Sequence, residues 1–454
     1  MVKILLFMGT RPEIIKMAPL IYGLAGKPEA EFVICDTSQH YDKELSKIFY
    51  EELKLPEPEF KLEIGSGSHG YQVSAVVKKA EEVITEYNPD LTVAEGDTNS
   101  VVGVALSSVK LKVPFAHVES GLRSYDMTMP EEVNRKIADS IASALFAPTE
   151  RAALNLLYEG INPSNIWVTG NTIADTLQLY IHRAKIESTI IQDLELESAD
   201  FLIVLTVHRP ENTDNPKRLK SILEAVRELE ECTILFPVHP RTKAKLEEYG
   251  MLKKLKSRKF KNLILLKPLG YVDFVRLLIE ADAILTDSGG IQEEAAILGK
   301  PCITLRDNTE RPETVELGFN MIAGASKDKI VDLTRKVIYD PSYIDSLSRI
   351  KHPFGDGHAG ERIANIIIEN FEDFKITAPK YHLSGAPTFR IYRVNEKLSG
   401  RTVYNLNPVI VTLIYHNGRP IIPTPDMTLE DGMLIRCLAE KPILEELEKK
   451  FNLA

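Results

Sequence analysis

The order in which apolar and amphipathic segments follow one another constrains this chain most. From residue 1 to about 350, short apolar runs alternate with longer segments whose apolar residues recur at helical spacing. Alternation of this kind favours parallel β-sheets with helices on both faces. It falls into two series, so we expect two doubly wound, Rossmann-like α/β domains. In open parallel sheets ligands bind beyond the carboxyl ends of the strands, which directs attention to the loops there.

The two series define the expected elements and domains. The first series of strands is Lys3–Met8, Phe32–Asp36, Leu91–Glu95, Phe115–Val118, Ala144–Ala147 and Ile166–Val168. The second is Leu202–Val207, Thr233–Pro237, Leu263–Leu266, Ala283–Thr286 and Cys302–Leu305. The expected helices include Ala174–Glu187, Pro216–Glu230 and Phe274–Ala281. We place the domains at 1–172, joined by a helix of about 358–374, and at 173–357.

The character of the chain changes after about residue 375. Prolines and glycines form a linker, and β-rich runs follow, with Asn417-Gly418 between two of them as a hairpin signal. A charged helix, Pro442–Phe451, closes the chain. We expect residues 386–454 to form a small α+β domain.

Composition excludes several classes of function. The net charge of −10 leaves no basic excess for binding nucleic acid or an anionic membrane. No apolar stretch approaches the roughly 20 residues that a membrane-spanning helix needs. The four cysteines are far apart and include no CxxC pair, which favours buried free thiols over disulfides or a zinc site. We expect a cytoplasmic protein.

The loop after the first strand has the features of an anion site. Gly9 permits a tight turn and Pro12 suits the first helical position. The helix start offers free amide N–H groups, and Arg11 and Lys16 add positive charge. A diphosphate would fit, although an ordinary strand–helix turn with two solvated cations explains the same residues.

Carboxylates follow two further strands of the first series. Asp97 comes after the strand that ends at Glu95, and Glu119 comes after the next. Carboxylates that converge from two strand ends are what proton transfer requires. The structural alternative is that Asp97 caps a helix and Glu119 pairs with Arg123.

A helix that begins at Pro130 carries Glu132 in its first turn and Arg135 about one turn on. The helix dipole stabilises an acid there for structural reasons alone, and it would also keep a general base ionised.

Two loops of the second series complete the candidate site. His208 ends a very apolar strand, within the run His-Arg-Pro-Glu-Asn. In the run Ser288-Gly289-Gly290, two glycines at a strand–helix turn expose amides to a phosphate, and the serine hydroxyl adds a donor. Glu294 could accept hydrogen bonds from ribose hydroxyls. Close helix packing is the other explanation for the glycines.

Taken together, these strings resemble the non-hydrolysing UDP-N-acetylglucosamine 2-epimerases. The matching strings occur in order over residues 1 to about 372. They are Gly9-Thr10-Arg11-Pro12-Glu13, Gly96-Asp97-Thr98, His117-Val118-Glu119, Pro130-Glu131-Glu132-Val133-Asn134-Arg135, Thr169-Gly170-Asn171-Thr172, His208-Arg209, Thr286-Asp287-Ser288-Gly289-Gly290-Ile291-Gln292-Glu293-Glu294, Glu310-Arg311-Pro312-Glu313 and Gly355-Asp356-Gly357. Ala94-Glu95 departs from the Val-His that many bacterial relatives have before this glycine.

The resemblance implies a GT-B architecture with a cleft between the two domains, and inversion at carbon 2 of UDP-GlcNAc to give UDP-ManNAc for glycan precursors. It implies elimination of UDP and its re-addition, so neither a cofactor nor a metal is expected. The implied acid and base groups are Asp97, Glu119, Glu132 and His208. The implied substrate contacts are Arg11, Lys16, Arg135, Ser288, Gly289, Gly290, Glu294 for the ribose, and Arg311 for the nucleotide or Glu294. Gln39, His40 and His239 correspond to a second, activating UDP-GlcNAc site of bacterial relatives.

Residues 387–452 resemble the TrkA-C (RCK-C) domain of potassium-channel regulators. The strings that carry this resemblance are Leu398-Ser399-Gly400-Arg401-Thr402, Ile410–Tyr415, Asn417-Gly418, Ile421-Ile422-Pro423, Leu429-Glu430-Asp431-Gly432-Met433-Leu434 and Leu444–Phe451. The resemblance implies a homodimer and a small-molecule effector, with passive dimerisation as the alternative.

Three other functions stay open on the sequence alone. A hydrolysing epimerase would release free ManNAc and UDP, but its relatives have Ala-Asp-Tyr after Gly-Thr-Arg, where this chain has Pro12-Glu13-Ile14. A second alternative within the same family is an epimerase that acts on a more decorated UDP-sugar, such as a 2,3-diacetamido uronate. A non-catalytic UDP-sugar sensor would not need the intact set of carboxylates.

Overall fold

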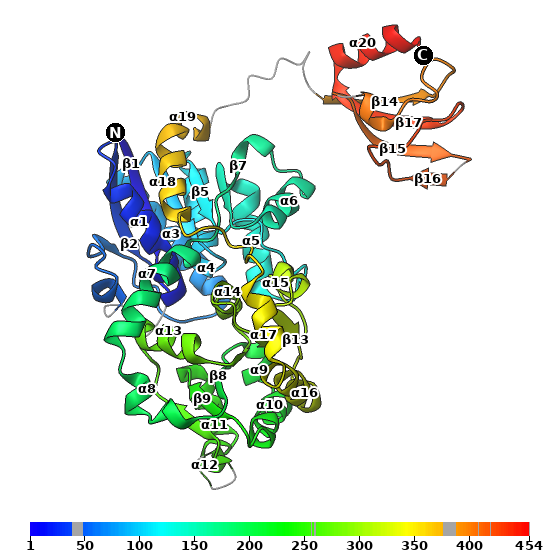
Figure 1. Cartoon of the computed structure of the whole chain (residues 1–454). Coiled ribbons are helices and arrows are strands. Elements are labelled where there is room, and N and C mark those ends of the chain that lie inside the picture. The colour runs from blue at the N-terminus through cyan, green and yellow to red at the C-terminus, as the bar shows by residue number, and fades with distance from the viewer. Residues whose placement is uncertain are drawn as a thin grey trace. The chain divides into compact units, whose positions relative to one another are not determined.

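The computed structural model describes residues 1–38, 49–255, 257, 260–375, 387–406, 408–417 and 419–453. The chain forms two compact units, Met1–Ile376 and Thr377–Ala454, which we describe separately (Figure 1). The larger unit contains two parallel sheets, and the smaller unit contains one antiparallel sheet. This confirms the expected fold class.

The first sheet has seven parallel strands in the order β3-β2-β1-β4-β5-β6-β7. Its strands are β1 Val2–Met8, β2 Ala30–Asp36, β3 Phe60–Lys61, β4 Leu91–Glu95, β5 Phe115–Val118, β6 Ala144–Ala147 and β7 Ile166–Val168. The helices between them are α1 Arg11–Ala25, α3 His69–Tyr87, α4 Asn99–Lys110, α5 Pro130–Ile141 and α6 Glu150–Tyr158, with a 3₁₀ turn η1 at Pro163–Asn165.

Strand β1 shows why its continuous apolar run forms a central strand. Successive side chains of a strand point to opposite faces of the sheet. Ile4, Leu6 and Met8 are buried in one apolar cluster with α1, while Leu5 and Phe7 are buried in another with α3 and α4. Both faces are therefore covered, as the sequence predicted.

The second sheet has six parallel strands in the order β10-β9-β8-β11-β12-β13. Its strands are β8 Leu202–Thr206, β9 Thr233–Pro237, β10 Leu263–Leu266, β11 Ala283–Thr286, β12 Cys302–Thr304 and β13 Asn320–Ile322. The helices around it are α9 Pro210–Thr213, α10 Pro216–Glu228, α11 Pro240–Glu248, α12 Leu252–Leu255, α13 Tyr271–Glu280, α14 Gly289–Ile297, α15 Pro312–Glu316, α16 Lys327–Ile338 and α17 Pro341–Ser348. The short edge strands β3 and β13 were not anticipated.

In each sheet the strand order reverses between two neighbouring strands, β1 and β4 in the first and β8 and β11 in the second. Loops at such a switch point diverge to opposite faces of the sheet and leave room for a ligand at the carboxyl ends. The loops after these four strands contain most of the residues singled out from the sequence.

The connections between the halves are α7 Thr172–Glu187, α8 Ile190–Asp193, η2 Leu196–Ser198, α18 Ala359–Glu369 and α19 Phe371–Phe374. Helix α18 returns to the first half and lies beside α1 (Figure 1). The approach is close, because a Cβ on Gly360 would lie 2.4 Å from the carbonyl carbon of Pro19. Asp175 of α7 accepts hydrogen bonds from the first amides of α18, Ala359 at 3.1 Å and Gly360 at 2.8 Å.

The two segments that pass between the halves touch at a pair of glycines. Gly170 and Gly355 both have positive φ, and a Cβ on Gly355 would lie 3.0 Å from the Cα of Gly170. The Asn171 amide donates to the Phe354 carbonyl at 3.0 Å. The conformation and the contact both favour glycine at these positions.

The smaller unit has an antiparallel sheet in the order β14-β17-β15-β16. Its elements are β14 Pro387–Arg393, η5 Val403–Leu406, β15 Ile410–His416, β16 Arg419–Ile421, β17 Leu434–Glu440 and α20 Lys441–Phe451. His416 pairs with Arg419, which confirms the hairpin predicted around Asn417. Helix α20 buries Leu444, Leu447 and Phe451 in the apolar cluster of this unit.

All four cysteines are free and buried, as predicted. Among the described residues, no helix is both long enough and apolar enough to cross a membrane.

Candidate active site

Loops from the two halves of the larger unit meet through charged side chains. Lys16 Nζ lies 3.2 Å from Glu293 Oε2, and Arg311 donates to Glu119 Oε1 at 3.1 Å. Arg209 pairs with Glu131 at 2.6 Å. Charged residues that the sequence placed at separate strand ends are therefore in contact across the junction.

The start of α1 differs from the prediction. We expected free amides for an anionic ligand, but Glu13 Oε2 accepts from the amides of both Gly9 and Thr10 at 2.8 Å. Thr98 also donates to Glu13 at 2.6 Å. The carboxylate of Glu13 occupies the place expected for the ligand at these two amides, so the expectation was wrong there.

Lys16 is the centre of what we term the junction cluster: Lys16, Glu95, Glu119, Glu293 and Arg311. Its ammonium contacts Glu119, Glu293 at 3.2 Å and Glu95 at 3.5 Å. Burial alone would lower the pKa of Lys16, but attraction to Glu119 and the other carboxylates outweighs it and raises the pKa. Lys16 is therefore a permanent cation.

Glu119 receives two cations, one from each half. Burial would raise the pKa of Glu119, but Lys16 and Arg311 lower it to about 2. The backbone of Glu119 has φ +64°, a conformation that costs energy for a residue other than glycine. This backbone conformation follows directly after β5, and with it the side chain of Glu119 points towards the junction cluster.

Arg311 fills the space beside α14. Its guanidinium contacts Glu310 at 2.7 Å, Glu293 at 2.8 Å and Glu119 at 3.1 Å. The sequence left a contact with Glu294 open, and the structure places Glu293 there instead. A Cβ on Gly289 would lie 2.6 Å from Arg311 Nη1, so this glycine makes room for the arginine.

Arg135 organises a second group, the Arg135 cluster, with Asp97, Glu132 and Glu310. Its guanidinium contacts Asp97 at 2.5 Å, Glu132 at 2.8 Å and Glu310 at 3.4 Å. Asp97 is not a helix cap, because Thr98 holds the N-cap position of α4. The structural alternative for Glu119 is also wrong, since Arg123 pairs with Asp139 and Glu159.

Glu132 is completely buried and accepts from four donors. These are the amide of Ser124 at 2.9 Å, the hydroxyl of Ser124 at 3.1 Å, the amide of Tyr125 at 3.0 Å and Arg135 Nη1 at 2.8 Å. The carboxylate thus fixes both a loop and the arginine. A proton from a substrate could reach it only after one of these donors had moved.

His117 of β5 holds the loop that contains Asp97 by a hydrogen bond to its backbone. Its Nδ1 lies 2.6 Å from Asp139 Oδ1, and its Nε2 lies 2.8 Å from the Gly96 carbonyl oxygen. The Gly96 carbonyl oxygen can only accept, so Nε2 donates to it, and the contact with Asp139 fixes the orientation of the ring. Its hydrogen bond fixes the peptide that precedes Asp97.

The loops of the second half place His208 and Ser288 next to Asp287. His208 Nδ1 lies 3.1 Å from Asp287, which also accepts from the amides of His208 and Arg209. Burial would raise the pKa of Asp287, but His208 and these donors lower it. Ser288 precedes α14 and makes no side-chain cap bond. A Cβ on Gly290 would meet no group of the described residues within 4 Å apart from its chain neighbours and the backbone of its own helix, so the space beside this glycine is open.

Glu294 is buried behind the junction cluster. Tyr271 donates to it at 2.8 Å, and burial raises the pKa of Glu294 to about 7. The positive charge of Arg11 attracts the carboxylate of Glu294. The guanidinium of Arg11 lies 4.9 Å from the ring centre of Phe49. Burial lowers the pKa of Arg11.

The residues matched to an activating site remain a prediction. Gln39 and His40 lie outside the described residues. His239 is the N-cap of α11 and accepts from the Arg241 amide at 3.2 Å. Its ring centre lies 5.7 Å from that of His208.

Several residues of the site have no role among the sequence predictions. They are Glu13, Glu95, His117, Arg209, Asp287, Glu293 and Glu310. Each had a detectable signal, because each lies in or next to a matched string at the end of a strand or the start of a helix. The spacing does not show which of two acids adjacent in the sequence, such as Glu293 and Glu294, points towards the junction cluster.

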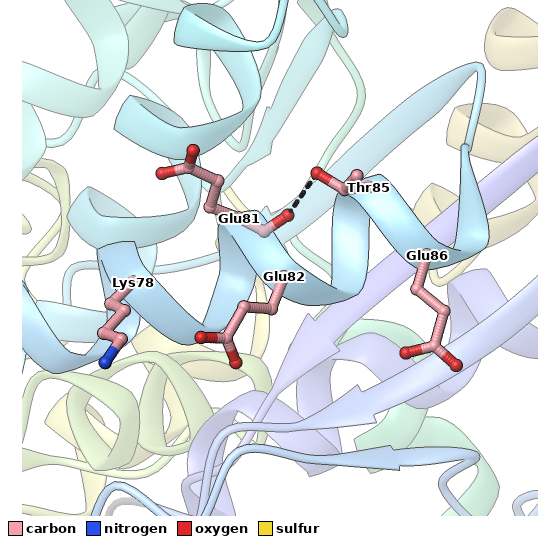
Figure 2. Close-up of a pocket in the computed structure, with 5 residues that line it drawn as sticks. All are labelled: Lys78, Glu81, Glu82, Thr85 and Glu86. Atoms are coloured by element: carbon pink, nitrogen blue, oxygen red, sulfur yellow. Dashed lines mark hydrogen bonds between the residues drawn. The ribbon is translucent and has the colours of Figure 1, made fainter.

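One surface hollow lies apart from these loops. It is lined by Lys78, Glu81, Glu82, Thr85 and Glu86, all from α3 (Figure 2). Thr85 donates to the Glu81 carbonyl at 2.7 Å, an ordinary contact within one helix. All of its lining residues come from a single helix, so polar groups from different elements do not meet there as they do at the junction cluster.

Two Rossmann-like halves joined at the carboxyl ends of their strands, with α18 returning to the first half, define the GT-B class of enzymes. Comparison with known proteins narrows this class. The profile of the family described as UDP-N-acetylglucosamine 2-epimerase matches residues 23–368. The chain belongs to this family of isomerases.

Individual relatives cover the same region. The UDP-N-acetylglucosamine 2-epimerase of Methanocaldococcus jannaschii is 47% identical over 369 residues, which are 80% of this chain and 98% of the relative. A crystal structure of the enzyme from that organism in complex with UDP-GlcNAc and UDP superposes with a TM-score of 0.75 at 45% identity, covering 81% of this chain and 99% of that one. The UDP-2,3-diacetamido-2,3-dideoxy-D-glucuronate 2-epimerase of Pseudomonas aeruginosa is 37% identical over 373 residues, 80% of this chain and 99% of the relative.

Proposed function

We propose that this chain interconverts UDP-GlcNAc and UDP-ManNAc without hydrolysis. A base removes the proton from carbon 2 while the bond between carbon 1 and the UDP oxygen breaks, which leaves a glycal and UDP. UDP then adds back to carbon 1, and a proton returns to carbon 2 on the opposite face. No atom is gained or lost overall.

One observation carries the proposal: Glu119 of the first half is buried in contact with Lys16 and with Arg311 of the second half. A reaction that moves a proton while a diphosphate departs needs a carboxylate and cations within one site. A diphosphate bound there would compete with Glu119 for these cations. As the cations turn to the diphosphate, the pKa of Glu119 rises from about 2 and the group becomes a better base.

We assign the other residues by their neighbours. Asp97 and Glu132, both bound to Arg135, are the remaining acid and base candidates, and His208 faces the diphosphate with Arg11, Lys16 and Arg135. Ser288, Gly289 and Gly290 bind phosphate at the start of α14. Glu294 binds the ribose, and Arg311 binds the nucleotide.

Proton NMR of UDP-GlcNAc incubated with the enzyme in heavy water tests the proposal. The expected result is UDP-ManNAc, with deuterium incorporated at carbon 2 of both sugars and little free UDP at equilibrium. Free ManNAc that accumulates as fast as substrate is lost would instead identify a hydrolysing epimerase. Absence of deuterium would identify a sensor without catalysis.

A second candidate substrate follows from the Pseudomonas aeruginosa relative, whose name gives a UDP-2,3-diacetamido uronate. Both nucleotide sugars should be tested side by side under the same conditions. If the enzyme converts the uronate and does not convert UDP-GlcNAc, the UDP-2,3-diacetamido uronate is its substrate.

For the smaller unit we propose a TrkA-C-like role in dimerisation and in binding a small-molecule effector. Its sheet exposes Phe389, Ile391 and Ile410, apolar side chains of the kind that interfaces cover. Light scattering of the full chain and of a chain ending at residue 376 checks this. A dimer is expected for the full chain only, and a dimer of the shortened chain would count against the proposal.

A further inference from the structure

Glu95 is a buried acid at the end of β4 that has no role in the proton transfers proposed above. The residue is 2% exposed and lies directly before the Gly96-Asp97 loop. Its Oε1 lies 3.5 Å from Lys16 Nζ, and the carboxylate of Glu119 contacts the same ammonium, so the two acids are neighbours. Two carboxyl groups can share a hydrogen bond only when one of them carries a proton.

The charge balance of the junction cluster indicates which group carries that proton. Lys16 and Arg311 supply two positive charges, and Glu119 and Glu293 each contact both of these cations. Glu95 contacts only Lys16, at the longest of the three distances from that ammonium. A third negative charge would be buried without a cation of its own, which costs much more than protonation.

Other cations do not change this balance. Glu310, the remaining acid next to Arg311, pairs with Arg306 at 2.8 Å as well as with Arg135 and Arg209. Those arginines are committed to the Arg135 cluster and its neighbours. They leave Glu95 with Lys16 as its only cationic contact among the described residues.

We propose that Glu95 is a positioning residue that donates a hydrogen bond, as a neutral carboxylic acid, to the carboxylate of Glu119 and so holds it ionised and aimed at the substrate. This inference rests on the proposed epimerase function. It differs from an ordinary salt bridge because the neutral form of Glu95, not its anion, supports the reaction.

The electrostatic surroundings of Glu95 agree with this role. The groups that face it are Lys16 and Glu13 from α1 and Glu119 after β5. Burial raises the pKa of Glu95 well above its usual value, Lys16 opposes this, and Glu119 and Glu13 add to it. Ionisation of Glu95 at high pH would replace the hydrogen bond to Glu119 with repulsion between two anions, so turnover should fall as pH rises.

A comparison of Glu95→Gln with Glu95→Leu tests the proposal. Glutamine keeps an N–H donor and cannot ionise, so we expect kcat at neutral pH within about threefold of wild type. Leucine removes the donor at position 95 and leaves the contacts of Glu119 with Lys16 and Arg311 in place, and it should lower kcat by about tenfold or more. The alkaline fall in kcat should also disappear in Glu95→Gln. Equal losses in both variants, or an unchanged alkaline fall, would overturn the proposal.

An infrared difference spectrum gives a readout that needs neither substrate nor the leucine variant. In wild type minus Glu95→Gln at neutral pH, we expect the carbonyl band of a protonated carboxylic acid. A carboxylate band in its place would show that Glu95 is ionised and would refute the inference. If the acid band is present but UDP-GlcNAc is inert, the epimerase proposal fails while the protonation of Glu95 stands.

Discussion

Alanine at Gly289 and alanine at Gly290 should have different effects, although the two residues are neighbours at the start of α14. A Cβ on Gly289 would lie 2.6 Å from Arg311 Nη1, 2.9 Å from Arg311 Cζ and 3.0 Å from Glu310 Oε1. Neither glycine has a positive φ, so the backbone accepts alanine at both positions. The difference between the two variants therefore isolates the contact with Arg311.

The magnitude follows from how firmly Arg311 is held. Its guanidinium cannot withdraw without loosening contacts to Glu293, Glu119 and Glu310. Overpacking at a well-packed site costs about 1–3 kcal/mol, so the free energy of unfolding should fall by that amount in Gly289→Ala. A displaced Arg311 should also lower kcat, because Glu119 loses one of its two cations.

Urea unfolding followed by circular dichroism, together with steady-state kinetics on UDP-GlcNAc, measures both effects. Gly290→Ala is the matched control and should change the free energy of unfolding by less than about 0.5 kcal/mol. Its KM should nevertheless rise, because the added methyl group occupies the open space proposed for the diphosphate. Equal stability of the two variants would refute the packing argument, and an unchanged KM in Gly290→Ala would refute the phosphate assignment.

Three further substitutions test individual carboxylates. Glu119→Gln and Asp97→Asn should each lower turnover by about 10²-fold or more while the circular dichroism spectrum is retained, and near-normal turnover would remove that residue from proton transfer. Glu294→Gln tests the pKa of about 7, which burial raises from 4.5. As pH rises from 4.5 to 7 the unfolded chain releases this proton before the folded chain does, so wild type loses about 3 kcal/mol of stability that the glutamine variant keeps. Urea titrations at pH 4.5 and pH 8 should show the two proteins diverging, and parallel curves would show that Glu294 titrates normally.

The sequence predicted the architecture well, because strand and helix periodicities are local properties. The runs that form β1, β4 and β8 are long, apolar and bounded by turn residues, and their positions were correct to within a residue or two. The edge strands β3 and β13 were not predicted, because a run of two or three residues is too short to show a strand periodicity. Their pairing depends on a neighbouring strand already being in place.

The site was predicted less completely, for a physical reason. The strand ends directed attention to the loops of Asp97 and Glu119, since parallel strands align their carboxyl ends, but the structure divides them between the Arg135 cluster and the junction cluster. Which acid of the pair Glu293-Glu294 meets Arg311 depends on the rotation of α14, and a shift of one residue turns a helical side chain by about 100°. The hydrogen bonds from the amides of Gly9 and Thr10 to Glu13 could not be predicted either, because a capping box and an anion site have the same sequence pattern.

The glycine pair Gly170 and Gly355 has a mechanical consequence. The chain passes between the two halves of the larger unit at these glycines, and the two passages touch. A contact between the two connecting segments opposes sliding of one half past the other more than it opposes rotation about the connection. If the two halves open to admit a nucleotide sugar, a rotation about these glycines would separate Glu119 from Arg311 and expose both side chains at once.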